Sequence, residues 1–329
     1  MTRHVVLVTY GEPPTANFLA QLRYSWRILL GLTRSVAPIP RAVLPLIALR
    51  RARLRRRTWT AERYASPLEP VTRRQAEGLA TELARLAPGT PWRVQVAYEF
   101  RDPPVPAVLD SLPPGEPVDL APMYVVESAF THEISRTAVA RWLARRNGRA
   151  AAAVRVLPPM DEAALAAVSI AHVRAALADA GYSAGADCAL VLAAHGTLLD
   201  PPRPMETGRE ATERLCRRIE EGLRGEFGMV ANGWLNHVYG GRWTEPAIED
   251  ALRQVAEAGF RRVVYYPYGF VADNAESELE GRVALRGRPE LVALHLPCLN
   301  DSRVYLAALA RQIDGERTEG RKDGRTESG

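Results

Sequence analysis

Short apolar segments alternate with amphipathic helical patterns along almost the whole chain, and this alternation constrains the fold more than any other feature of the sequence. Each apolar segment is four or five residues long. Strands that alternate with helices pair in parallel sheets, because each helix carries the chain back to the same edge of the sheet. The sequence therefore predicts an α/β fold with strands at residues 5–9, 94–97, 118–121, 154–157, 190–194, 230–234, 263–266 and 292–296.

A long helical pattern at residues 161–180 separates the predicted strands into two groups of four. This division predicts two similar halves, residues 1–158 and 159–314, each a four-stranded parallel sheet flanked by helices, with a cleft between them. The motifs GxGxxG and GxxxxGK[ST] do not occur, so the sequence gives no sign of the usual nucleotide cradles. Residues 315–329 are charged and lack apolar side chains, which predicts a disordered tail.

The composition indicates a globular chain with a weak basic balance. The net charge of +5 comes from Arg rather than Lys and is too small to indicate a nucleic-acid partner. Cys188, Cys216 and Cys298 have no CxxC spacing, so we expect no iron–sulfur cluster and no permanently bound cofactor. The first residues lead straight into a strand, and the longest apolar stretch is too short to span a bilayer. We therefore expect a cytoplasmic protein whose contact with membranes, if any, is peripheral.

One segment, residues 41–57, breaks the alternation by joining an apolar octet to a run of arginines. One interpretation is a helix with a solvated basic face. The other is an entrance lip, in which the apolar part meets a flat apolar ligand or a bilayer and the arginines hold carboxylates or lipid headgroups. Both interpretations can hold for the arginines of this segment, which are Arg50, Arg51, Arg53, Arg55, Arg56 and Arg57.

The fifth predicted strand ends in a histidine, His195, which leads into a Gly-Thr turn. Ligands of open parallel sheets bind beyond the carboxyl ends of the strands, where His195 would lie. A lone histidine in this position is nevertheless more often structural than functional. The ends of the other strands carry aromatic or polarizable side chains, which suit a flat apolar ligand but are also typical of a core: Tyr10, Met123, Tyr124, Trp234 and Phe270.

A cluster of acids follows Phe270, and three of them, Asp273, Glu276 and Glu280, have the i, i+3, i+7 spacing of one helix face. Acids in a first turn can simply complement the helix dipole. This face and His195 are, however, expected at the same edge of the second half. An imidazole that faces a carboxylate can hold a divalent metal transiently or take protons from a ligand, although the pair lacks the four ligands of structural zinc.

Several short motifs occur in a fixed order along the chain. They are Tyr10-Gly11-Glu12-Pro13, Arg63-Tyr64, Ser66-Pro67-Leu68, Leu120-Ala121-Pro122, Ala194-His195, Trp243 to Pro246, Gly269 to Glu276, and Cys298-Leu299-Asn300. In this order and spacing the chain resembles the ferrochelatase family over about residues 4–312. No single motif is decisive, and the resemblance rests on their combination.

The resemblance implies two Rossmann-like halves and the insertion of Fe²⁺ into a porphyrin, coproporphyrin III or protoporphyrin IX, in haem biosynthesis. Fe²⁺ would be a substrate. His195 and Glu276 would take the metal and remove the pyrrole protons, with Asp273 and Glu280 as additional candidate ligands. The residues expected to contact the porphyrin are Tyr10, Arg27, Arg63, Tyr64, Ser66, Met123, Tyr124 and Trp234.

The chain also departs from the family pattern, so it resembles a divergent member. Asn274 stands where the family usually has His, and Gly196-Thr197-Leu198 replaces Ser followed by Leu or Ile and Pro. Such changes alter the groups that orient metal ligands. Two other functions therefore stay open: a chelatase for another tetrapyrrole or metal, and a non-catalytic protein that binds haem or porphyrin.

Overall fold

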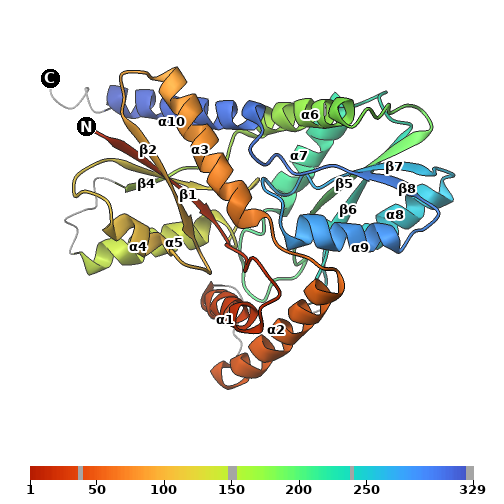
Figure 1. Ribbon diagram of the computed structural model, residues 1–329, viewed down its shortest axis with the longest axis horizontal. Helices are drawn as coiled ribbons and strands as arrows, with labels where there is room; N and C mark the ends of the chain where they lie inside the picture. Colours follow the sequence, from red (N-terminus) through yellow and green to blue (C-terminus); the bar gives the residue numbers. More distant parts are fainter. Residues whose placement is uncertain (36–39, 147–153, 238–240, 324–329) are drawn as a thin grey trace.

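Two four-stranded parallel sheets, one in each half of the chain, organise the structure (Figure 1). This computed structural model describes residues 1–35, 40–146, 154–237 and 241–323. The first sheet contains, in spatial order, β2 (Trp92–Tyr98), β1 (Arg3–Thr9), β3 (Val118–Pro122) and β4 (Val154–Val156). The second contains β6 (Met229–Leu235), β5 (Cys188–His195), β7 (Arg262–Tyr266) and β8 (Val292–His295). The predicted α/β fold and all eight predicted strands are confirmed.

Helices cover both faces of each sheet (Figure 1). They are α1 (Phe18–Ser35), η1 (Arg41–Val43), α2 (Leu44–Ala61), α3 (Leu68–Leu86), α4 (Val105–Asp110), α5 (His132–Arg145), α6 (Glu162–Asp179), α7 (Arg209–Gly222), α8 (Ile248–Glu257), η3 (Ala275–Glu280), α9 (Gly281–Arg286) and α10 (Arg303–Asp323). Val5 and Leu7 of β1 pack with α3 and α10, whereas Val6 and Val8 pack with α4 and α5. Strand β5 divides its side chains in the same way between α6 and α7 on one face and α8 and α9 on the other.

The two sheets share one strand order, β2-β1-β3-β4 and β6-β5-β7-β8. In each sheet the chain begins at an inner strand, moves to one side and then crosses to the other. A topological switch point therefore lies where the carboxyl ends of β1 and β3 adjoin, and again where those of β5 and β7 adjoin. Tyr10, Tyr124 and His195 lie at these strand ends, where open α/β sheets bind their ligands.

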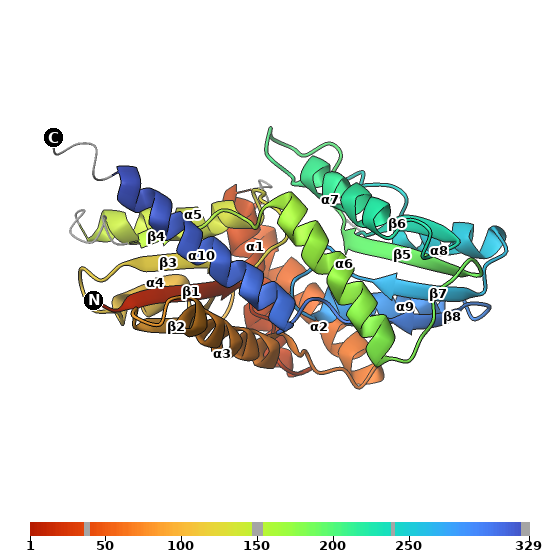
Figure 2. The same ribbon diagram turned by 90° about the horizontal axis from the view of Figure 1, so that it is seen from above.

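The last helix, α10, connects the two halves. It packs on α3 of the first half and on α6 of the second (Figure 2). The contact with α3 is so close that a Cβ added at Gly78 would lie 2.5 Å from Cδ1 of Leu306. The helix continues to Asp323, so the disorder predicted from residue 315 is wrong as far as Asp323. The reason is that α10 is already anchored by its buried face, and Glu, Arg and Lys extend an existing helix readily. Residues 324–329 lie outside the described part of the chain.

Helices α1 and α2 pack against each other below the two sheets in Figure 1, on the side opposite α6 and α10. The predicted lip, residues 41–57, corresponds to η1 and most of α2. Leu44 is buried with side chains of α1, whereas Leu46 and Leu54 are 68% and 62% exposed. Among the described residues, no helix combines the length and the apolar character needed to cross a bilayer.

Candidate metal centre

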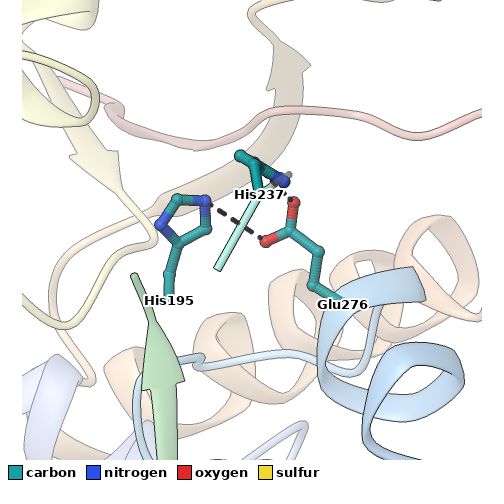
Figure 3. Close-up of side chains that lie close together, drawn as sticks. All are labelled: His195, His237 and Glu276. Carbon is teal, nitrogen blue, oxygen red and sulfur yellow. Dashed lines mark ion pairs between the residues drawn. The ribbon is translucent and has the colours of Figure 1, made fainter. Parts of the chain in front are cut away.

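His195 is the last residue of β5 and presents its ring at the edge of the second sheet. The preceding strand residues, from Ala189 to Ala194, are fully buried, so the core fixes the backbone from which the ring projects. Nδ1 donates to the carbonyl oxygen of Gly196 at 2.5 Å, which leaves Nε2 to face Glu276 (Figure 3). An imidazole held in this way can accept a proton or bind a cation through Nε2.

Glu276 lies in the first turn of η3, which is a π-helix. Asn274 caps this helix, because its side-chain oxygen accepts the backbone N–H groups of Glu276 and Ser277 at 2.9 and 3.2 Å. The Ser277 hydroxyl accepts the N–H of Asn274 in return at 2.9 Å. Asn274, which stands where the family pattern has His, therefore serves as the cap of this helix. From this capped turn, Oε2 of Glu276 lies 3.6 Å from Nε2 of His195. Short π-helical turns of this kind often occur at functional sites.

A third residue, His237, joins the pair, and the sequence interpretation missed it. Its Nε2 lies 4.0 Å from Oε1 of Glu276, and one ligand atom from each of the three residues lies within 4.8 Å of the others (Figure 3). The interpretation took Trp234 as the end of the sixth strand, but β6 continues to Leu235. Leu235 pairs with His195 across the sheet. His237 lies two residues beyond Leu235, at the edge of the sheet where ligands bind, so the true end of β6 points to it.

The charges around Glu276 keep it ionised. Burial raises the pKa of its carboxyl, but the neighbouring groups, chiefly His195 and the guanidinium groups of Arg51 and Arg55, outweigh this effect and hold the pKa below its usual value. Burial also lowers the pKa of His237 to about 4, so its ring is neutral at neutral pH. A neutral imidazole and an ionised carboxylate are the protonation states in which these groups bind a divalent cation.

The two further acids that were predicted near the metal differ in position. Asp273 precedes the helix cap, and its carboxylate accepts the backbone N–H of Cys298 at 2.8 Å and the side-chain amide of Asn300 at 2.6 Å. The predicted helix face of three acids does not include Asp273, because η3 begins only at Ala275. Glu280 lies about one π-helical turn beyond Glu276. Burial and the charge of Glu276 raise the pKa of Glu280 to about 8, which keeps it protonated at neutral pH.

Tyr10 and Tyr124 form a second cluster at the edge of the first sheet. Their ring centroids are 5.0 Å apart. The Tyr10 hydroxyl donates to the carbonyl of Phe130, and the Tyr124 hydroxyl donates to Oε2 of Glu99 at 2.9 Å. Burial, followed by the charges of Glu99 and Glu276, raises the pKa of Tyr10 well above its usual value. The aromatic cluster therefore lies within electrostatic reach of Glu276 and occupies the matching switch point of the other sheet.

Glu99 predicts a pH dependence of stability. Burial raises its pKa to about 8, although hydrogen bonds from Ser135 and Tyr124 lower it in part. Between the unfolded value of 4.5 and the folded value, the folded protein binds more protons than the unfolded chain. The free energy of unfolding should therefore fall as the pH rises through this window. We expect the free energy of unfolding of Glu99→Gln to fall by about 2 kcal/mol less than that of the wild type as the pH rises to about 8.5.

Urea denaturation at a series of pH values measures this effect. The exposed carboxyl of Glu257 provides the matched control, because Glu257→Gln changes the same chemical group at the end of α8. If wild type, Glu99→Gln and Glu257→Gln lose stability equally between pH 5 and about 8.5, the assignment to Glu99 is wrong.

Glu12 connects the lip to η3, the helix that carries Glu276, and it is not among the predicted site residues. Its Oε1 accepts from the Arg55 guanidinium at 3.2 Å. Its Oε2 accepts from the Ser66 hydroxyl at 2.7 Å and from the backbone N–H of Ala275, the first residue of η3, at 3.0 Å. Ser66, predicted as a porphyrin contact, is instead buried as part of this network.

The arginines of the lip divide between the interior and the solvent. The guanidinium of Arg55 lies over the rings of Tyr24 and Trp59, at 5.2 and 4.8 Å from their centroids. Burial lowers the pKa of Arg51, and the charge of Glu276 partly opposes this. The inner arginines, Arg51 and Arg55, thus lie near carboxylates of the protein itself, Glu12 and Glu276, and the entrance lip stays a prediction. The remaining arginines of the segment are exposed, as expected for a solvated basic face: Arg50, Arg53, Arg56 and Arg57.

Three other predicted porphyrin contacts lie on or beside the helices of the lip. Arg27 of α1 is half exposed and pairs with Asp102 at 3.0 Å. Arg63 follows α2, is exposed and has a left-handed φ of 49°. Tyr64 is buried, with its ring edge-on to Trp59 at 4.8 Å in a cluster that includes η3. The structure thus brings Tyr64 against η3, while Arg27 pairs with Asp102 and Arg63 is exposed.

Two predicted contacts lie in the core. Trp234 is 1% exposed and Met123 is 4% exposed. Trp234 is covered because helices lie on both faces of the sheet and β6 continues beyond it. Met123 packs beneath α10, where its sulfur accepts the Tyr305 hydroxyl at 3.9 Å. Their prediction as porphyrin contacts is corrected, because both side chains are core residues.

Comparison with known proteins agrees with this geometry. The family model for ferrochelatase matches residues 3–316. The ferrochelatase of Azoarcus sp. is 31% identical over 95% of this chain and 87% of its own, and that of Xylella fastidiosa is 27% identical over 93% and 95%. CbiX, the terminal enzyme for biosynthesis of siroheme in denitrifying bacteria, shares the fold, with a TM-score of 0.52 at 18% identity over 96% of this chain and 99% of that one. SirB from Bacillus subtilis superposes with a TM-score of 0.51 at 11% identity, over 95% of each chain. The chain belongs to the ferrochelatase family.

Proposed function

We propose that this protein inserts Fe²⁺ into a porphyrin, coproporphyrin III or protoporphyrin IX, and that His195 and Glu276 take the metal and remove the pyrrole protons. The observation that carries the proposal is the approach of Nε2 of His195 to Oε2 of Glu276 at 3.6 Å. The two groups come from separate elements that converge at one switch point of the second sheet. Iron is a substrate in this proposal, and no resident cofactor is required.

Metal insertion needs a dehydrated cation presented from one face of the macrocycle and the removal of two N–H protons. The ionised carboxylate of Glu276 can neutralise the cation and accept a proton. The Nε2 lone pair of His195 can coordinate the cation or accept a proton from the other side of the gap. Tyr10 and Tyr124 suit the opposite face of a flat apolar ring, because their rings pack beside each other at the ends of the first sheet's strands, tilted by 53°.

Anaerobic incubation with Fe²⁺ and each of the two porphyrins tests the proposal through the appearance of haem absorbance. We expect turnover with at least one of them. A protein that binds porphyrin but never metallates it would instead be the non-catalytic binding relative. Parallel reactions with Co²⁺, Ni²⁺ and Zn²⁺ across several macrocycles identify a chelatase of different specificity, which would contradict Fe²⁺ as the substrate metal.

We propose further that the lip contacts the cytoplasmic face of a membrane. Leu46 and Leu54 are largely exposed and Ile47 is 37% exposed, and exposed arginines flank them. Apolar side chains beside cations suit a bilayer surface with anionic headgroups. Leu46→Asp with Ile47→Asp is expected to weaken binding to vesicles that contain phosphatidylserine by at least about tenfold.

Co-sedimentation with these vesicles measures the effect. Val292→Asp provides the control, because this side chain is 69% exposed on β8, away from the lip. Equal sedimentation of the wild type, the lip variant and the control contradicts membrane contact through the lip.

A further inference from the structure

Gly196 allows the residues that follow β6, Asn236 and His237, to lie close to the end of β5. A Cβ added at Gly196 would lie 1.9 Å from Oδ1 of Asn236 and 3.0 Å from the carbonyl oxygen of Leu235. The backbone N–H of Gly196 donates to that same carbonyl at 2.8 Å. Glycine at this position therefore allows the loop to approach the end of β5, and the residue that follows Asn236 is His237.

Other contacts fix Asn236 and the His237 ring. The Asn236 side-chain amide donates to the carbonyl of Thr244 at 2.8 Å. The ring of His237 lies edge-on between those of His195 and Trp243, with centroids at 5.2 and 5.3 Å. His237 is thus held beside His195 by packing on two sides, while its side chain stays 38% exposed and accessible to a cation.

The two carboxylate oxygens of Glu276 each face one imidazole. Oε2 lies 3.6 Å from Nε2 of His195, and Oε1 lies 4.0 Å from Nε2 of His237. Metal–ligand bonds of about 2.1 Å place neighbouring ligand atoms about 3.0 to 3.4 Å apart. The two separations between Glu276 and the histidines therefore exceed those of a coordinated set by only about 0.2 to 1 Å, and all three ligand atoms lie within 4.8 Å of one another.

We infer that His237 is a third protein ligand, so that the centre is a two-histidine, one-carboxylate site that binds a divalent cation before the porphyrin arrives. The inference rests on the proposed function and extends it to how the metal is held. Three protein ligands with an open position are typical of catalytic rather than structural metal sites. Imidazole and carboxylate together suit Fe²⁺, Co²⁺ and Zn²⁺.

Titration of the porphyrin-free protein with Co²⁺ under anaerobic conditions tests this inference through the visible absorption of the bound ion. We expect one strong site in the wild type and a Kd at least about tenfold higher in His237→Ala, because even groups that only support a ligand change affinity by this amount. His172→Ala is the matched control, since His172 lies on α6 and its ring bonds to the carbonyl of Pro297. An unchanged Kd in His237→Ala overturns the inference.

A cysteine at position 237 gives a direct signature of coordination. A thiolate bound to Co²⁺ adds a near-ultraviolet charge-transfer band, which we expect in His237→Cys and not in His172→Cys or the wild type. The native cysteines, Cys188, Cys216 and Cys298, are buried, so they give a constant background. Circular dichroism and a melting curve without metal show whether each variant folds, and the titration of His237→Ala decides the question if the cysteine variant does not.

Turnover separates this inference from the proposed function. With a third ligand, His237→Ala should raise KM for Fe²⁺ by at least about tenfold and change kcat less than a replacement of His195 does. If the wild-type protein metallates no porphyrin, the proposed function is contradicted, but the Co²⁺ titration still tests the third ligand. Normal turnover in a His237→Ala variant whose Co²⁺ affinity is also normal removes only the third ligand.

Discussion

Replacing His195 with Ala is expected to lower the rate of metal insertion by at least about 10³-fold while porphyrin binding persists. The expectation follows from the two roles assigned to Nε2, since proton transfer alone is typically worth 10²–10⁴ in rate and the metal also loses a ligand. The porphyrin should still bind, because the aromatic cluster at Tyr10 and Tyr124 belongs to the other sheet. Haem absorbance under anaerobic conditions measures insertion, and the change in porphyrin fluorescence measures binding.

Two further variants make this result specific. Glu276→Gln keeps the shape of the side chain but removes its charge, and it should lose a comparable part of the rate with an unchanged porphyrin Kd. His172→Ala removes an imidazole on α6, outside the site, and should leave the rate unchanged. Turnover in His195→Ala near the wild-type level would exclude His195 from the mechanism, and a parallel loss of porphyrin binding would make its role one of substrate binding.

The sheets could be predicted from the sequence because a parallel strand covered by helices on both faces is a continuous apolar run. Residues 190–194 show this, since all five side chains are fully buried in β5. The end of α10 could not be predicted from composition. A charged segment is disordered when it stands alone, but residues 315–323 continue a helix whose preceding turns are held in the core.

The candidate site could be predicted only in part. His195 can be predicted because it follows a continuous apolar strand. His237 cannot, because the apolar pattern ends at Trp234, one residue before the observed end of β6. Glu276 was correctly placed on a helix near His195, but Asp273 was grouped with it on the assumption of a regular helix. The actual helix begins after an extended Asn274 and has π-helical turns, and neither feature is visible in the spacing of the acids.

The network around Glu12 predicts the largest change in stability. Its carboxylate is 7% exposed, faces the Arg55 guanidinium, and accepts the first backbone N–H of η3. Glu12→Ala would leave a largely buried cation without its counter-charge and would also release the hydroxyl of Ser66. We expect the free energy of unfolding to fall by about 3 kcal/mol, because removing one partner of a buried ion pair leaves the other uncompensated.

Urea denaturation at neutral pH checks this value against two variants. Glu12→Gln keeps an oxygen acceptor for Ala275 but loses the charge opposite Arg55, so its effect should be intermediate. Asp200→Ala breaks an ion pair with Arg242 in which the side chains are 66% and 75% exposed, and it should change stability by no more than about 0.5 kcal/mol. If Glu12→Ala is no more destabilising than Asp200→Ala, Glu12 does not hold the lip against η3. If Glu12→Ala is clearly the more destabilising, the first turn of η3 depends on a residue from the first half of the chain. The position of Glu276 is then set jointly by both halves.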